Sequence, residues 1–267
     1  MKKYANHLIL MISIFLLFPV TIMAASMADF VFVVDQSGSM YNEFKWISSS
    51  LNKIDESIKA QNITANYGIA GFEYTTGSQS TRYGTRNAWA DVPSDISTVI
   101  AEADWAADNL YGGIERGYHA AGWAADNFSW TEENYAKIMI LITDEDADYG
   151  NTYSYNGYFG EEALGQKMKD ENILLNVITY SHLNDVWDDA AFAKDDYIGL
   201  FDLDYLKDDP TNFTIDFTDA KIQEIIEYEP SGAAPVPEPA TLFLLGAGLI
   251  GLGGVKRKKK SGTTSKA

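Results

Sequence analysis

Three oxygen-bearing side chains occupy alternate positions in the segment Asp35-Gln36-Ser37-Gly38-Ser39. A carboxylate and two hydroxyls are hard ligands, which suit Mg²⁺ or Mn²⁺ and are also compatible with Ca²⁺. An apolar run over residues 29–34 precedes them and predicts a buried strand, so Asp35 falls at a carboxyl end, where open α/β sheets bind ligands. The pattern predicts a divalent-cation site. The alternative interpretation is a turn and a helix cap, which Ser and Asp also favour.

A second aspartate follows a second apolar run. Residues 137–143 form the clearest buried strand of the sequence, and Asp144 comes directly after it. The carboxyl ends of parallel strands meet at one edge of a sheet, so this carboxylate is expected to face Asp35 there. The acidic stretch that Asp144 opens is not an EF-hand loop, because Tyr149 and Tyr155 stand where that loop needs Gly and Glu.

Apolar runs and helical periodicity alternate along the middle of the chain. The expected strands are residues 29–34, 67–74, 137–143, 173–179 and 197–203. The expected helices are residues 41–60, 95–108, 115–127, 161–170 and 218–228. This alternation predicts an α/β fold with a mainly parallel central sheet flanked by helices.

Composition excludes several kinds of function. The chain of 267 residues has no cysteine, which excludes disulfides, thiolate zinc sites, iron–sulfur clusters and a cysteine nucleophile. It has three histidines, one of them near the N-terminus, so a multi-histidine metal centre is also excluded. The net charge of −18 repels phosphate backbones, and we expect no nucleic-acid partner. No Ser-His-Asp order and no phosphate-binding loop stands out, so we expect a binding module and not an enzyme.

Both ends of the chain are predicted to lie outside the folded domain. Residues 1–28 start with two lysines, continue with an apolar run and end in small residues, which is typical of a signal peptide for export. At the other end, residues 230–241 form a linker that contains Pro237-Glu238-Pro239. Residues 242–255 are a short apolar membrane segment, and residues 256–267 are a basic tail expected on the cytoplasmic side.

The order of these C-terminal parts resembles the PEP-CTERM sorting signal of Gram-negative bacteria, with Pro237, Glu238 and Pro239 as its motif. The resemblance implies a precursor anchored in the inner membrane, recognition by an exosortase-like protease, and a final place at the cell surface or outside the cell. It also implies an association with extracellular polysaccharide. The alternative is a plain C-terminal membrane anchor.

The segment Asp35–Ser39 and the later Asp144 resemble the von Willebrand factor type A (VWA) domain, over residues 29–229. The resemblance implies a Rossmann-like three-layer fold and a metal-ion-dependent adhesion site. Ser37 and Ser39 would bind the metal directly, and Asp35 and Asp144 directly or through water. An oxygen of a protein or polysaccharide ligand would complete the coordination.

One position departs from the family pattern. The family supplies a threonine from a middle loop, and this chain has Ile114 there, in Gly112-Gly113-Ile114-Glu115. An isoleucine side chain cannot bind a metal. Glu115 either substitutes for the threonine or is an acidic residue of a first helical turn, where it complements the helix dipole.

We therefore expect an exported bacterial VWA-domain protein with a metal-dependent adhesion site. The alternative is a metal-independent structural or matrix protein with a degenerate site. A metal-dependent hydrolase is disfavoured, because no general base accompanies the pattern. Two further features bear on the ligand: clusters of acidic residues, and an aromatic-rich loop after Asp144, which carries Tyr149, Tyr153, Tyr155, Tyr158 and Phe159.

Overall fold

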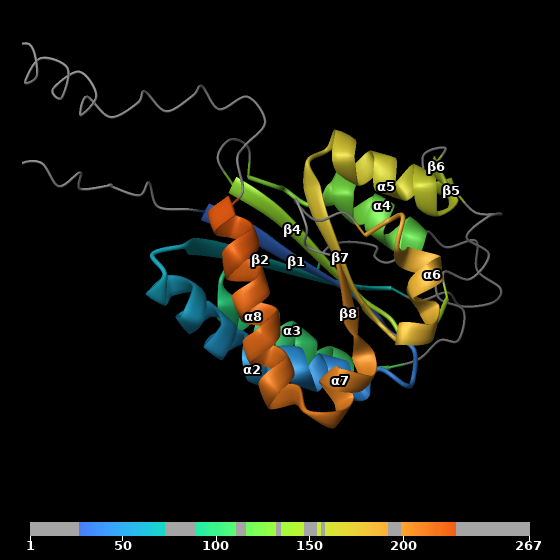
Figure 1. Cartoon of the computed structure of the whole chain (residues 1–267). Coiled ribbons are helices and arrows are strands. Elements are labelled where there is room, and N and C mark those ends of the chain that lie inside the picture. The colour runs from blue at the N-terminus through green and yellow to red at the C-terminus, as the bar shows by residue number, and fades with distance from the viewer. Residues whose placement is uncertain are drawn as a thin grey trace, which may run out of the picture. The chain divides into compact units, whose positions relative to one another are not determined.

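The computed structural model describes residues 27–72, 89–110, 116–131, 135–146, 154–155, 158–191 and 199–227 (Figure 1). Residues 25–231 form one compact unit. The signal peptide, the sorting motif and the membrane segment expected from the sequence lie outside the described residues. Among the described helices, none has both the length and the apolar character needed to cross a membrane.

A six-stranded sheet with the order β3-β2-β1-β4-β7-β8 forms the centre of this unit. Five strands run parallel: β1 (Met27–Asp35), β2 (Thr64–Phe72), β4 (Tyr135–Ile142), β7 (Ile173–Thr179) and β8 (Leu200–Asp202). Strand β3 (Ala90–Ser94) pairs antiparallel with β2 at one edge. A separate two-stranded ribbon consists of β5 (Ser154–Tyr155) and β6 (Tyr158–Phe159).

Helices cover both faces of the sheet (Figure 1). One face carries α2 (Tyr41–Ala60), α3 (Ile96–Ala107), α7 (Leu203–Asp208) and α8 (Pro210–Glu227). The other carries α4 (Gly117–Asn127), α5 (Gly160–Asp170) and α6 (Asn184–Trp187), the last preceded by a 3-10 turn, Ser181–Leu183. The described residues thus form a three-layer α/β fold with a mainly parallel sheet, which confirms the predicted fold class.

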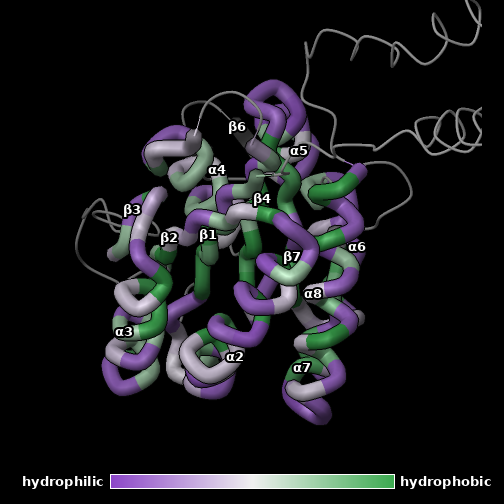
Figure 2. Tube along the Cα trace, turned by 90° about the vertical axis from the view of Figure 1, so that its left-hand side faces the viewer, coloured by the Kyte–Doolittle hydropathy of each residue, from purple (hydrophilic) through white to green (hydrophobic). Residues whose placement is uncertain are grey.

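Alternation along the buried strands separates the two cores. In β1, Phe30 and Phe32 pack with α2, α3 and α8, whereas Val31 and Val33 pack with α4 and α5. Both sets are almost fully buried, which explains why the strand reads as a continuous apolar run and not as an alternating one. Figure 2 shows the hydrophobic residues concentrated on the central strands and the hydrophilic ones on the outer helices.

The predicted elements agree best where apolar residues are dense. Helix α2 and strand β7 have the predicted bounds, and β1 is longer than predicted by two residues at its start and one at its end. The last helix begins at Pro210 and not at residue 218, because Pro suits a first helical turn and the Thr and Asn after it are weak helix signals. Strand β3 was not predicted. It contains Pro93, which an edge strand tolerates.

Helix α8 is held to the sheet partly by buried charges. Lys221 and Glu224 are almost completely buried, and the Lys221 ammonium donates to the Glu224 carboxylate and to the Asn176 side chain of β7. The same nitrogen lies 5.1 Å from the centre of the Phe201 ring of β8. Burial lowers the pKa of the Lys221 ammonium, and the negative charge of Glu224 opposes that effect. These contacts join α8 to both of the last two strands.

A close backbone approach fixes the packing of α5 against the segment after α6. A Cβ atom added at Gly165 would lie 2.3 Å from the Asp189 carbonyl oxygen. In a solvent-exposed helix, replacing Gly by Ala raises the free energy of unfolding by about 1 kcal/mol. At Gly165 the added Cβ would overpack against backbone, which costs about 1–3 kcal/mol, so the substitution is expected to destabilise the protein.

We expect Gly165→Ala to lower the free energy of unfolding by up to about 2 kcal/mol, the surplus of overpacking over helix propensity. Urea unfolding monitored by circular dichroism measures it. Gly38→Ala is the matched control, because a Cβ there meets no atom within 4 Å. Equal stability of the two variants would contradict the close contact.

Candidate metal centre

Asp35 is the last residue of β1, and its side chain is fully buried. One carboxylate oxygen accepts a hydrogen bond from the backbone N–H of Ser37 at 2.7 Å. The other accepts from the Thr143 hydroxyl, just after β4, at 3.2 Å. These two bonds orient the carboxylate from its own loop and from the neighbouring strand.

Ser37 and Ser39 lie together beside this carboxylate. Their hydroxyl oxygens are 2.9 Å apart, with Ser37 buried and Ser39 exposed. The loop is folded back by a bond from the Met40 N–H to the Ser37 carbonyl at 3.2 Å. Helix α2 begins after Met40 without a side-chain cap. The serine hydroxyls therefore do not cap this helix, which weakens the cap interpretation, although Asp35 does form the predicted turn.

Asp144 follows β4 at the same edge of the sheet. Strands β1 and β4 pair in parallel with Val34 opposite Ile142, so Asp35 is level with Thr143 and Asp144 follows one residue later at the same edge. The Asp144 Oδ1 atom is buried and has no hydrogen-bond partner among the described residues. A buried, unpaired carboxylate oxygen costs about 1–3 kcal/mol or more, unless a cation or a water satisfies it. The structure thus places Asp35, Ser37 and Ser39 in one hydrogen-bonded loop at the end of β1 and Asp144 directly after the neighbouring strand; their joint role as metal ligands stays a prediction.

Glu43, in the first turn of α2, is a site residue that the sequence reasoning missed. Its side chain is fully buried, and one oxygen lies 3.3 Å from the Lys207 ammonium of α7. Burial raises the pKa of the Glu43 carboxyl, Lys207 opposes this, and the charge of Asp144 adds to the rise. Glu43 lies one turn before Ile47 on the apolar stripe of α2, and this position could have predicted that it is buried. A charged residue at the start of a helix is, however, normally taken as the exposed end of such a stripe.

Several predicted site residues lie outside the described part of the chain. They include Ile114 and Glu115, so both interpretations of Glu115, as a substitute for the family threonine or as a residue of a first helical turn, stay predictions. The side chains of the aromatic loop after Asp144 and the sorting residues Pro237, Glu238 and Pro239 are also outside it. The two remaining histidines are placed. Burial lowers the pKa of His119, in α4, to about 4, and His182 is exposed and stacks on Tyr180.

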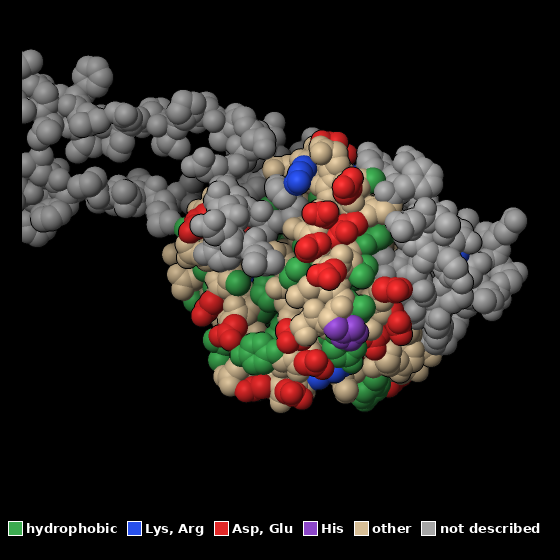
Figure 3. Space-filling view, turned by 45° about the vertical axis from the view of Figure 1, so that its right-hand side comes forward, with side chains coloured by type: hydrophobic (Ala, Val, Ile, Leu, Met, Phe, Trp, Pro, Cys, Tyr) green, Lys and Arg blue, Asp and Glu red, His purple; other side chains and the backbone are tan. Residues whose placement is uncertain are grey.

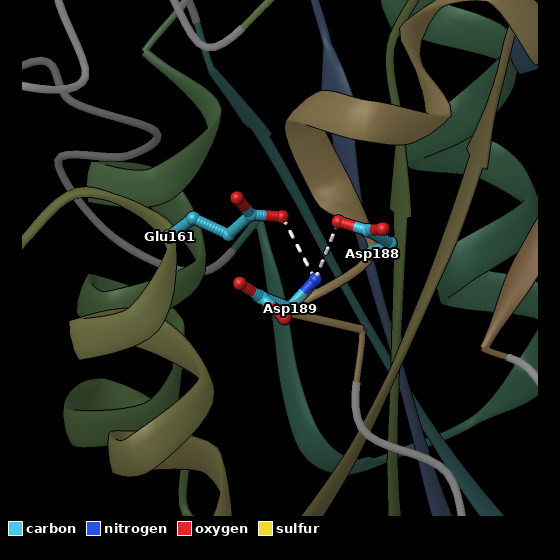
Figure 4. Close-up of side chains that lie close together, drawn as sticks. All are labelled: Glu161, Asp188 and Asp189. Atoms are coloured by element: carbon cyan, nitrogen blue, oxygen red, sulfur yellow. Dashed lines mark hydrogen bonds between the residues drawn. The ribbon is translucent and has the colours of Figure 1, made fainter.

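The acidic clusters expected from the sequence form an anionic surface. Figure 3 shows acidic side chains over one face of the molecule with few basic ones among them. Three of them converge: Glu161 of α5 meets Asp188 and Asp189, with one carboxylate oxygen of each within 4.8 Å of the others (Figure 4). The Asp189 N–H donates to Glu161 at 2.8 Å and to Asp188 at 3.0 Å.

Burial, together with the charges of Asp188 and Asp189, raises the pKa of Glu161 to about 6 from an ordinary value of 4.5. A raised carboxyl pKa means that folding favours the protonated form. Its contribution to stability is therefore complete below pH 4.5 and is lost as the pH rises through about 6.

We expect Glu161→Gln to raise the melting temperature above that of the wild type by a few degrees at most at pH 8, because the ionised carboxylate is disfavoured there. At pH 4.5 the difference should vanish. Thermal unfolding at both pH values measures it, with Glu162→Gln as the control for removing one exposed charge from the same helical turn. A loss of stability at pH 8 would show that the carboxylate is needed in its charged form.

Comparison with protein families matches residues 29–194 to the von Willebrand factor type A domain, over more than half of the chain. Residues 235–258 match the PEP-CTERM protein-sorting motif. That motif indicates an exported protein, anchored in the membrane before processing by an exosortase-like system. A comparison with curated proteins found no match.

Among solved structures, the chain is similar to the pilus adhesin SpaC from Lactobacillus rhamnosus GG, with a TM-score of 0.50 and 15% identity over 76% of this chain and 31% of that one. It also matches proximal thread matrix protein 1 from the mussel byssus, with a TM-score of 0.47 and 16% identity over 75% of this chain and 47% of that one. The chain thus spans less than half the length of either protein. At this identity, the likeness to SpaC concerns the fold.

Proposed function

The chain belongs to the von Willebrand factor type A family, and on this premise we propose that it is an exported adhesion or matrix-binding module whose ligand edge depends on a divalent cation. The observation that supports the proposal is the hydrogen-bonded loop of Asp35, Ser37 and Ser39 at the end of β1, with Asp144 directly after β4, the strand paired with β1. Its ligands are a protein or a polysaccharide of the extracellular matrix.

The side chains present fit a hard cation. Ser37 and Ser39 would offer hydroxyls, and Asp35 and Asp144 carboxylates, so all the donors are oxygens, as Mg²⁺ or Mn²⁺ requires. The unpartnered Oδ1 of Asp144 is the atom that gains most from a cation. When bound, the metal supplies a positive centre that accepts an oxygen of the ligand. Without it, the same carboxylates repel an acidic ligand.

The protein's own contribution is to hold these donors in place. Thr143 binds Asp35 from the neighbouring strand, and the Ser37 backbone binds it from the loop, so its carboxylate needs little reorganisation. The Thr143 hydroxyl also accepts from the Glu145 N–H at 3.2 Å, which fixes the chain on both sides of Asp144. Prearranged donors lower the entropy lost on binding. This donor set supports binding and not catalysis.

A metal-independent structural role is the second candidate. The observation that favours it is that the Asp35 carboxylate already has partners on both oxygens, so the loop is held together without a cation. The isoleucine at position 114 points the same way.

Calorimetric titration of Mg²⁺, Mn²⁺ and Ca²⁺ into the purified chain separates the two candidates. We expect one Mg²⁺ or Mn²⁺ per chain, and at least a tenfold loss of affinity in Asp35→Ala. Asp204→Ala, at an exposed carboxylate in the first turn of α7, is the control for removing one negative charge. No binding, or equally weak binding by all three proteins, would mean that the acidic surface only collects counterions and would favour the structural role.

Asp144→Asn provides a second test through stability. With a chelator, we expect the substitution to leave the free energy of unfolding unchanged or to raise it, because an unpaired buried charge is removed. With Mg²⁺ at about a hundred times its dissociation constant, the wild type should gain about 2.7 kcal/mol and the variant much less. Denaturant unfolding in both buffers measures this. A wild type whose stability ignores Mg²⁺ would contradict the metal site.

A further inference from the structure

Two exposed aromatic rings stand beside the metal edge. Trp105, in the last turn of α3, is 52% exposed, and Tyr41, the first residue of α2, is 47% exposed. Helix α2 starts from the metal loop, and α3 lies against it with its last turn next to the first turns of α2, because Lys45 and Asp104 form an ion pair at 2.9 Å. The two rings thus flank one end of the helix pair, the end from which Asp35–Ser39 emerges.

A third ring supports Trp105 and joins it to the metal loop. Trp89 meets Trp105 edge-on, with ring centres 5.9 Å apart and an interplanar angle of 82°. Trp89 lies so close to β2 that a Cβ on Gly71 would be 2.0 Å from its ring, and 3.0 Å from Gln36 Cγ. Gln36 is the residue after Asp35. We name Tyr41, Trp89 and Trp105 the aromatic ledge.

The ledge has the layout of separate stacking platforms. Its two exposed rings are separated by the Lys45–Asp104 pair, and Lys45 Nζ lies 5.8 Å from the centre of the Tyr41 ring. The core of a protein–protein interface is a continuous apolar patch depleted of charge. A surface that alternates rings with charged and hydrogen-bonding groups fits a ligand that itself alternates apolar faces with hydroxyls.

We propose that the aromatic ledge binds a chain of uncharged sugar residues. The C–H face of a pyranose is apolar and slightly positive, so it stacks on the negative face of an aromatic ring. The hydroxyls around it hydrogen-bond to groups such as the Asp104 carboxylate, which is exposed beside Trp105.

Charge selects among polysaccharides. Asp104 and Asp108 flank Trp105, and the whole chain carries −18. An anionic polymer would approach like charges, whereas a neutral one meets no such cost. The ligand class is therefore a neutral polysaccharide and not an acidic one.

This inference rests on the proposed function, because it names the class of ligand that the proposed binding edge takes. Metal binding and polysaccharide binding can nonetheless be tested separately, since the side chains of the aromatic ledge are not metal ligands. Trp105→Ala removes a platform and leaves the four oxygen donors, while Asp35→Ala does the reverse.

Affinity electrophoresis of the full chain in detergent measures binding, in native gels that contain dextran, hydroxyethylcellulose or alginate. We expect at least one neutral polymer to retard the wild type, and alginate not to. Trp105→Ala should weaken binding about fivefold to tenfold, the worth of about one stacking contact, and Trp105→Phe less. Ile215→Ala is the matched control, because Ile215 is equally exposed, at 53%, but lies on α8.

Three results would overturn the inference: no retardation by either neutral polymer, stronger retardation by alginate, or equal effects of Trp105→Ala and Ile215→Ala. Circular dichroism of each variant shows whether a loss reflects folding, and if Trp105→Ala misfolds, Trp105→Phe and Trp105→Leu take its place. A separate experiment removes the metal, either by Asp35→Ala or with a chelator. If the gels still retard the protein after Mg²⁺ binding is lost, the result supports polysaccharide binding by the aromatic ledge. Absent Mg²⁺ binding in the wild type would remove the metal proposal alone.

Discussion

The site depends on the parallel pairing of β1 with β4. Because Val34 lies opposite Ile142, the next residues, Asp35 and Thr143, lie level with each other at one edge of the sheet. The Thr143–Asp35 hydrogen bond spans the two chain segments at that point. A shift of one residue in this register would turn every side chain of one strand to the other face and separate Thr143 from Asp35. Such a shift would also exchange the two buried cores, and their burial therefore fixes the geometry of the oxygen donors.

Buried charge positions the helices around this edge. Glu43 ties the first turn of α2 to Lys207 of α7, and Lys221 of α8 binds Glu224 and Asn176 above β7. Apolar contacts alone would let a helix slide along its groove, whereas a buried ion pair tolerates little displacement, because breaking it leaves an uncompensated charge. Burial is the main cause of the raised pKa of Glu43, and the charge of Asp144 adds to it, which is consistent with Glu43 lying near the edge that carries Asp144.

The sequence predicted the parts of the structure that local pattern determines. Residues 41–60 carry apolar residues at helical spacing and residues 173–179 form an apolar run, and the bounds of this helix and this strand were predicted correctly. Asp35 and Asp144 were singled out because each comes at the end of a buried run, and the structure places Asp35 at the end of β1 and Asp144 just after β4. Strand β3 and the position of Glu43 were missed because each depends on a partner elsewhere in the chain: β2 for the edge strand and Lys207 for Glu43. The start of α8 was missed for a local reason, since the Thr and Asn after Pro210 are weak helix signals. The aromatic ledge, like β3 and Glu43, depends on distant partners, since Trp105 meets Trp89 and lies near the start of α2 only through the packing of α3.

The proposed metal site and the proposed ledge together restrict the kind of ligand that can use both. A cation at the proposed site calls for an oxygen of the ligand, and the exposed rings call for an apolar face with few charges. A polymer rich in carboxylates satisfies the cation but meets Asp104, Asp108 and the net charge of −18. A purely apolar ligand satisfies the rings and offers the cation nothing. A polyhydroxylated, uncharged chain meets both demands, because each of its units carries oxygens at its rim and C–H groups on its face. The distance from the metal loop to Trp105 is bridged by Trp89, which contacts both β2 beside Gln36 and the Trp105 ring. The Trp89 ring therefore packs on β2 and also supports Trp105, so the proposed binding surface follows from how β2, α2 and α3 pack.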